Sequence, residues 1–393
     1  MNKLSLRGGL ILALAAFLAS GCTTLTDLKT DISERLLGRD NPNPPAALVE
    51  FKPTLQPGII WNARVGASEN YDFSPAVQSG AVYTASTEGD ITKLDAIQGN
   101  IVWRIKAKEK LSGGVGLGQN LLLVGSVKGN VLAYDLNGNF LWQAKVSSEV
   151  LSAPRATDAV VIVRAGDSRI FGLDIADGKR KWVYERATPA LSLRSSAGIV
   201  VDEGVVYAGF AGGKLIAVRV DDGKVIWEST VAQPKGTTEI ERIADITSLP
   251  VVDGAMVYAV AYQGKVAAVD RASGRVVWNR DISSYTGMCA ADGKVYIAHA
   301  TGAVYALDYA SGKTFWRQGG LSQRNLSAPL ALGNSIVVGD VQGYLHFMDR
   351  EDGAFSARLL TEDSPILPQI VELGSSGFVV QTRNGGLYAI SLK

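Results

Sequence analysis

Short runs of alternating apolar and polar residues recur along the chain, each bounded by glycine, aspartate or asparagine. In residues 264–278 one apolar run leads to Asp270, a turn containing Gly274 follows, and a second run ends at Trp278. Residues 302–316 repeat this pattern around Asp308 and Gly312. Alternation with a period of two predicts half-buried strands, and the Asp and Gly positions predict a tight turn between them. Each copy is therefore expected to be a strand, a turn and a second strand.

The tryptophans fall on one period of about 40 residues, which indicates a structural repeat. Their positions are Trp61, Trp103, Trp142, Trp182, Trp227, Trp278 and Trp316, and an eighth position holds Ala357. Glycine lies four residues before each position from Trp103 onward, at Gly99, Gly138, Gly178, Gly223, Gly274, Gly312 and Gly353. The most direct interpretation of the tryptophans is packing between neighbouring repeats.

Two further short strands precede each such pair, which gives four strands per period. Four antiparallel strands every 40 residues or so are typical of β-propeller blades. We predict an all-β, eight-bladed propeller of four-stranded antiparallel blades over residues 51–393. The strand that carries Trp61 has no partners of its own, so it is expected to pair with the last blade and close the ring.

The first residues form a separate region. Residues 1–21 combine Lys3 and Arg7 with an apolar stretch and a small-residue ending, the pattern of a secretory signal, and the ending before Cys22 is similar to the bacterial lipoprotein box. We expect Cys22 to be acylated and residues 22–50 to form a lipid-anchored tether. The alternative is an ordinary signal with an incidental cysteine. Thr23 after Cys22 resembles the sorting signal for the outer membrane.

Charge and candidate chemistry narrow the function. The 39 basic and 38 acidic residues leave no excess positive charge, which argues against nucleic acid as a partner. His299 and His346 are expected within strands and are too isolated for a zinc site, and Cys289 is expected to be a small buried residue. No catalytic motif is recognisable, so we predict no enzyme activity, no metal and no cofactor.

Two consecutive connections exceed the usual period, between Trp182 and Trp227 and between Trp227 and Trp278. Both are expected on one face of the ring, side by side, where apolar residues next to arginine suit a protein interface. The candidate partner-binding residues are Leu191, Leu193, Arg194, Glu239, Arg242 and Asp245. The alternative is that the loops pack on their own blades and that Arg194 merely pairs with Asp245.

Two resemblances bear on function. The repeat resembles that of pyrroloquinoline-quinone dehydrogenases, but those enzymes typically carry adjacent cysteines, which this chain lacks. The lipoprotein box, the Pro-rich tether and the segments 191–194 and 236–245 resemble the BamB family of propeller lipoproteins. That resemblance implies a non-catalytic scaffold at the periplasmic face of the outer membrane, which binds the POTRA domains of BamA and supports β-barrel insertion.

In that family the positions matching Leu191, Leu193, Arg194 and Asp245 contact BamA, and Thr247 stands where a second acid is common, which implies a weaker acidic contact here. The resemblance leaves open direct contact with unfolded outer-membrane proteins. A quinone-dependent periplasmic dehydrogenase and a periplasmic propeller with an unrelated partner are the alternatives.

Overall fold

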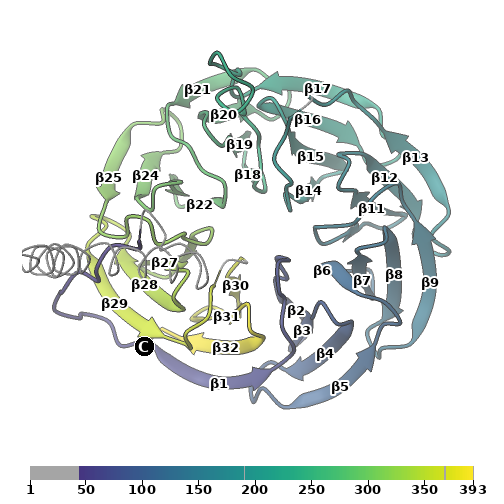
Figure 1. The fold of residues 1–393 in the computed structure, drawn as a ribbon, viewed down its shortest axis with the longest axis horizontal. Helices are drawn as coiled ribbons and strands as arrows, with labels where there is room; N and C mark the ends of the chain where they lie inside the picture. Colours follow the sequence, from purple (N-terminus) through teal and green to yellow (C-terminus); the bar gives the residue numbers. More distant parts are fainter. Residues whose placement is uncertain (1–43, 190, 367–368, 393) are drawn as a thin grey trace, which may run out of the picture. The chain divides into compact units, whose positions relative to one another are not determined.

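The computed structural model describes residues 44–189, 191–366 and 369–392, of which those from Ala46 onward form one compact unit. Within these residues 32 strands form eight four-stranded antiparallel sheets. The sheets surround a central axis as the blades of a propeller, with the first strand of each blade innermost (Figure 1). The predicted fold class is confirmed.

The strands of blades 1 to 4 follow chain order. Blade 1 comprises β2 (Ala76–Gln78), β3 (Ala81–Ala85), β4 (Asp90–Asp95) and β5 (Ile101–Lys106). Blade 2 comprises β6 (Leu111–Gly118), β7 (Leu121–Ser126), β8 (Asn130–Asp135) and β9 (Phe140–Lys145). Blade 3 comprises β10 (Arg155–Ala156), β11 (Val160–Arg164), β12 (Ile170–Asp174) and β13 (Arg180–Tyr184). Blade 4 comprises β14 (Ile199–Asp202), β15 (Val205–Phe210), β16 (Lys214–Arg219) and β17 (Val225–Thr230).

Blades 5 to 7 repeat this order, and blade 8 joins both ends of the chain. Blade 5 comprises β18 (Val251–Asp253), β19 (Met256–Val260), β20 (Val266–Asp270) and β21 (Val276–Arg280). Blade 6 comprises β22 (Gly287–Ala291), β23 (Lys294–Ala298), β24 (Val304–Asp308) and β25 (Thr314–Gln318). Blade 7 comprises β26 (Leu330–Leu332), β27 (Ser335–Gly339), β28 (Tyr344–Asp349) and β29 (Phe355–Leu360). Blade 8 comprises β30 (Val371–Glu372), β31 (Gly377–Gln381), β32 (Gly386–Ser391) and β1 (Gly58–Arg64).

Ring closure follows the predicted pairing. β1 lies antiparallel to β32, with Trp61 opposite Ala389 and Asn62 opposite Tyr388. In Figure 1 the purple β1 and the yellow β32 lie side by side at the rim of the ring. The first and last strands of the propeller are therefore held together by a hydrogen-bonded ladder.

The Asp, Gly and Trp positions of the repeat act together between blades. The Trp278 indole N–H donates to the carbonyl of Tyr309 in the next blade at 2.9 Å, and a Cβ atom on Gly312 would lie 2.6 Å from the indole ring. Asp308 Oδ1 accepts the backbone N–H of Ser311 at 2.7 Å, and Gly312 has a φ of +70°, so this turn needs both residues. The same indole bond joins Trp61 to Ala96, Trp103 to Leu136, Trp142 to Ile175, Trp182 to Val220, Trp227 to Arg271 and Trp316 to Arg350.

The tryptophan missing at Ala357 has a structural reason. Each indole binds the turn between the third and fourth strands of the next blade, but in blade 8 those strands are β32 and β1, the two ends of the propeller. No covalent turn exists there for an indole to bind. Ala357 is buried, and Leu55 packs into the same apolar cluster.

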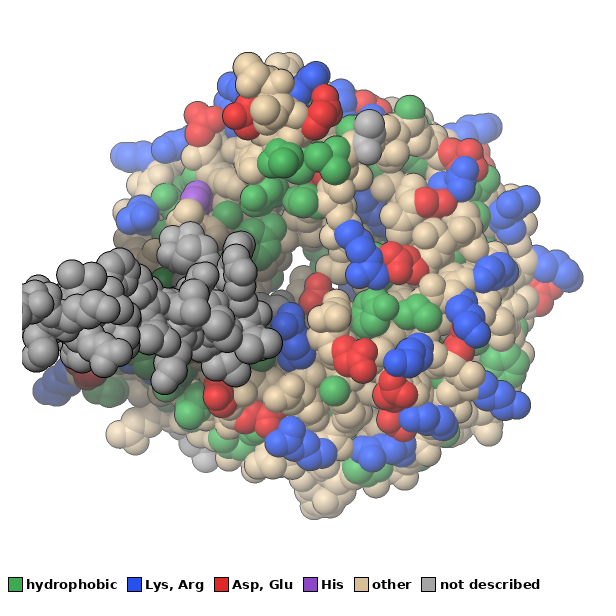
Figure 2. Space-filling view, viewed as in Figure 1, with side chains coloured by type: hydrophobic (Ala, Val, Ile, Leu, Met, Phe, Trp, Pro, Cys, Tyr) green, Lys and Arg blue, Asp and Glu red, His purple; other side chains and the backbone are tan. Residues whose placement is uncertain are grey.

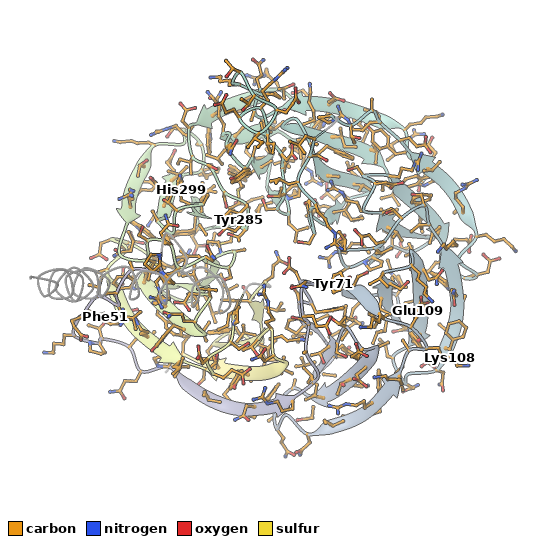
Figure 3. All side chains as sticks on the ribbon, viewed as in Figure 1. Phe51, Tyr71, Lys108, Glu109, Tyr285 and His299 are labelled. Atoms are coloured by element: carbon orange, nitrogen blue, oxygen red, sulfur yellow. The ribbon has the colours of Figure 1, made fainter. Side chains whose placement is uncertain are left out.

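Residues 46–57, here called the strap, lie along blade 7 before β1 begins. The Ala46 N–H donates to the carbonyl of Ser322, the Thr54 N–H donates to the carbonyl of Ser356, and Phe51 stacks on Phe355 with ring centroids 5.5 Å apart. Figure 3 labels Phe51 at this edge of the ring. Residues 46–50, which we placed in the tether, thus pack on the propeller, whereas the rest of the tether up to residue 43, with Cys22 and the signal segment, lies outside the described residues.

Candidate functional site

The two long connections occupy residues 185–198, between β13 and β14, and residues 231–250, between β17 and β18. They meet through Asp245, whose Oδ2 accepts the backbone N–H of Leu193 at 2.7 Å. Asp245 Oδ1 accepts the N–H of Gly212 at 2.9 Å, and the side chain is only 3% exposed. The predicted proximity of the two loops is thus observed, and the buried carboxylate of Asp245 holds the Leu193 backbone in place.

Arg194 does not pair with Asp245. Its Nε and Nη2 atoms donate to the two carboxylate oxygens of Glu149 at 2.9 and 2.8 Å, and its guanidinium lies 5.5 Å from the ring centre of Tyr71. The hydrogen bond to Glu149 raises the pKa of Arg194, and the hydrogen bond from Arg194 lowers the pKa of Glu149. The alternative pairing in which Arg194 binds Asp245 was wrong, because Arg194 binds Glu149 and the buried Asp245 accepts backbone N–H groups instead.

Glu149 and Tyr71 are site residues that sequence reasoning missed. Glu149 lies between β9 and β10, and Tyr71 lies between β1 and β2, in connections of ordinary length. Asp72, next to Tyr71, accepts a hydrogen bond from the Ser196 hydroxyl at 2.7 Å. Two other loops, which carry Glu149 and Tyr71, therefore fix the position of Arg194.

The exposed side chains fall into two groups. Leu191 is 42% exposed, Leu193 is half-buried and Arg194 is exposed, and these three residues are here called the docking face. Glu239 and Arg242 lie on a separate exposed turn beside the exposed Ile240, and Arg242 Nη1 lies 3.7 Å from Glu239 Oε1. Glu241 closes that turn by accepting the N–H groups of residues 237 and 238. Within the described chain no hydrogen bond or ion pair joins Glu239 or Arg242 to Arg194.

A hollow of about 720 Å³ at the ring axis borders the docking face. Leu193 and Arg194 line it together with the inner strands of several blades. Figure 2 shows the opening at the centre of the ring, and Figure 3 labels Tyr71 and Tyr285 beside it. The docking face thus lies at the mouth of the axial opening.

The residues considered for metal or redox chemistry lie apart. His346 is buried in β28 and its Nε2 lies 2.8 Å from Asp340, whereas His299 follows β23 in a turn, so its predicted place within a strand was wrong. Cys289 is half-buried in β22, so its expected full burial was wrong, but desolvation raises the pKa of its thiol to about 12, which keeps it protonated at neutral pH. The described residues contain no group of three or more His, Cys, Asp or Glu side chains arranged to hold a metal ion.

The described part of the chain contains no helix that is long and apolar enough to span a bilayer.

A family model and the curated relatives of this chain carry the same description. A family model described as "Outer membrane protein assembly factor BamB" matches residues 87–318 and 293–393. The outer membrane protein assembly factor BamB of Nitrosomonas eutropha is 46% identical over 380 residues, which cover 96% of this chain and 93% of that protein. The protein of the same name from Burkholderia pseudomallei is 39% identical over 345 residues, covering 88% of this chain and 90% of that one.

Solved structures of two kinds superpose on this chain. The crystal structure of BamB from Moraxella catarrhalis superposes with a TM-score of 0.79 at 25% identity, covering 86% of this chain and all of that one. The quinohemoprotein alcohol dehydrogenase of Comamonas testosteroni superposes with a TM-score of 0.69 over 85% of this chain and 76% of its own, but at 14% identity this likeness shows a shared fold alone. The chain therefore belongs to the BamB family of outer membrane protein assembly factors.

Proposed function

We propose that this protein is a non-catalytic scaffold of the β-barrel assembly machinery and that its docking face binds the POTRA domains of BamA. The observation that carries the proposal is the hydrogen bond between Asp245 and Leu193, which ties the two longest connections into one surface on a rigid ring. Its relatives are named outer membrane protein assembly factors, and the resemblance of segments 191–194 and 236–245 to the BamB family supplies the partner.

The residues of the docking face suit protein recognition. Exposed leucine provides an apolar anchor, and arginine beside it provides hydrogen-bond donors and is one of the residue types that contribute most at interface centres. Arg194 is already held by Glu149 and Tyr71, so little side-chain entropy is lost when a partner binds. In this proposal Asp245 acts as a positioning residue, while Glu239, Ile240 and Arg242 provide a second, peripheral contact.

The interface is tested by purifying the intact lipoprotein from its own membrane and quantifying BamA. Arg194→Glu should abolish recovery of BamA, because it reverses the charge at the face and repels Glu149. Arg317→Glu is the matched control, because Arg317 likewise lies over a tyrosine ring, that of Tyr305 at 5.6 Å, on the distant blade 6. Unchanged BamA recovery with Arg194→Glu, or recovery of an unrelated protein alone, would refute the assignment.

We further propose that Cys22 carries the lipid that anchors the protein to the periplasmic face of the outer membrane. The support is the signal-like segment 1–21 and the small residues before Cys22. Cys22→Ser should release the protein into the soluble periplasmic fraction. Continued attachment of that variant to membranes would contradict the anchor.

The absence of catalysis is part of the same proposal. The dehydrogenases share the fold at low identity, and the sequence lacks their adjacent cysteines. Addition of pyrroloquinoline quinone and calcium should therefore produce no new absorbance band and no alcohol oxidation. Either signal would favour the enzyme alternative over the scaffold.

A further inference from the structure

A small pocket of about 30 Å³ lies among the loops that carry the docking face. Arg164, at the end of β11, lines it together with Asp245 and with the serine residues Ser168, Ser192 and Ser195. All of these residues except Arg164 lie in connections on the face that carries Leu193. The pocket adjoins the axial hollow, because Leu193 and Ser195 line both, but Arg164 itself takes no part in the interface argued above.

Arg164 is a buried cation without an ion-pair partner among the described residues. Its side chain is 7% exposed, its Nη1 atom has no hydrogen-bond partner, and no ion pair to it is found among the described residues. The guanidinium lies 4.9 Å from the ring centre of Phe210, which offers only a cation–π contact. Burial lowers the pKa of Arg164 to about 10, so the group stays charged at neutral pH.

An unpaired buried charge destabilises a folded protein, because the charge loses its hydration and gains no partner. Asp245 lines the same pocket, but no ion pair or hydrogen bond joins it to Arg164 among the described residues, and its two oxygens accept the N–H groups of Leu193 and Gly212 instead. Buried donors in native proteins almost always have an acceptor, so an orphan of this kind calls for one that binds from outside.

We propose that Arg164 receives the carboxylate of an acidic side chain of the protein that docks on Leu191, Leu193 and Arg194. A guanidinium fork matches a carboxylate in geometry and charge, and the hydroxyls of Ser168 and Ser192 can donate to it as well. The small volume suits the carboxylate end of a side chain and excludes larger anions, whereas a free carboxylate as small as formate still fits. The identity of the occupant rests on the proposed function, whereas the observation that Arg164 has no ion-pair partner is independent of that function.

The first test measures the free protein. Arg164→Met keeps the length of the side chain and removes the charge, so the full-length protein should unfold at a temperature about 1–3 °C higher. Arg186→Met is the matched control, because Arg186 lies over the same Phe210 ring at 5.4 Å but pairs with Glu228. It should give no increase. A lower unfolding temperature for Arg164→Met would show a structural role and overturn the proposal.

A second test uses formate as a free carboxylate. Sodium formate should raise the unfolding temperature of the wild type more than that of Arg164→Met, because only the wild type has the cation to bind it. Comparison of the two proteins in the same salt series cancels general salt effects. Equal shifts would overturn the pocket as a carboxylate site.

The third test uses the partner. Capture of detergent-solubilised BamA should fall at least about tenfold for Arg164→Met and stay near the wild-type level for Arg186→Met. Normal capture by Arg164→Met together with lost capture by Arg194→Glu would reject the buried contact and leave the proposed function standing. Normal capture by Arg194→Glu would reject the docking face and with it this occupant, while the formate result would still decide on the pocket.

Discussion

The carboxylate of Asp245 accepts the backbone N–H of Leu193 across 52 positions of the sequence, and this bond ties the connection after blade 3 to the connection after blade 4. Because Asp245 is buried, its effect on any partner is exerted through the loop that it holds. The residue thus sets the geometry of a surface that it barely reaches.

Replacement of Asp245 by Ala should free that loop. The variant leaves the N–H groups of Leu193 and Gly212 without an acceptor, which we expect to cost about 1–3 kcal/mol of unfolding free energy. The Leu193 amide should then exchange its hydrogen at least about tenfold faster than in the wild type, which hydrogen-exchange mass spectrometry measures. Asp253→Ala, at an exposed position of β18, is the control. Unchanged protection of Leu193 would show that Asp245 does not hold the loop.

The contacts between blades predict a difference between two glycines. Gly312 and Gly254 both have positive φ, +70° and +54°, but a Cβ atom at Gly312 meets the Trp278 ring whereas none of the described atoms lies within 4 Å of one at Gly254. Both alanine variants carry the backbone strain, and only Gly312→Ala adds the clash. Urea unfolding should show a loss of stability larger by about 1–3 kcal/mol for Gly312→Ala. Equal losses would mean that the tryptophan contact is unimportant.

A buried histidine predicts a pH dependence. His346 is fully buried, its Nε2 lies 2.8 Å from Asp340, and its Nδ1 accepts the Arg358 Nε–H at 3.4 Å, which requires the neutral ring. Burial lowers the pKa of His346, so the stability present above about pH 6.5, the unfolded value, is lost as the pH falls through the folded pKa. Arg358 and Arg324 bind the strap carbonyls of Val49 and Ala46, so protonation should also loosen the strap.

The measurement is the slope of unfolding free energy against pH in a His299→Gln background, in which His346 is the one histidine left. In this background the slope below pH 6.5 should approach about 1.4 kcal/mol per pH unit. When His346→Gln is added to it, the slope above pH 5 should disappear. An identical slope in both proteins would assign the dependence to other groups.

Much of the fold could be predicted because the repeat encodes contacts between blades. Gly312 and Trp278 belong to neighbouring repeats and touch, so the regular spacing of Gly and Trp along the sequence reflects contacts between adjacent blades. The position of the missing eighth tryptophan could be predicted but its cause could not, because the cause is that β32 and β1 are the last and first strands and are not joined by a turn. The strap was missed because Phe51 and Leu55 have no period and are ordered only by contact with blade 7.

The candidate site was predicted in part. Loop length located Leu191 and Arg194, since insertions interrupt a regular spacing. Glu149 and Tyr71 left no such signal, because they reach Arg194 from loops of ordinary length in other blades. The burial of Asp245 was equally invisible, since a sequence does not distinguish a surface acid from one that accepts backbone hydrogen bonds.

The most direct test of the proposed docking face is site-specific photo-crosslinking in intact cells. A photoreactive residue would replace Leu191, which is 42% exposed, or Val225 on the outer strand β17, which is 49% exposed. Similar exposure makes the two positions comparable, so a difference reports location alone. We predict a crosslink to BamA from position 191 and none from position 225. A crosslink to BamA from position 225 and none from position 191 would contradict the docking face.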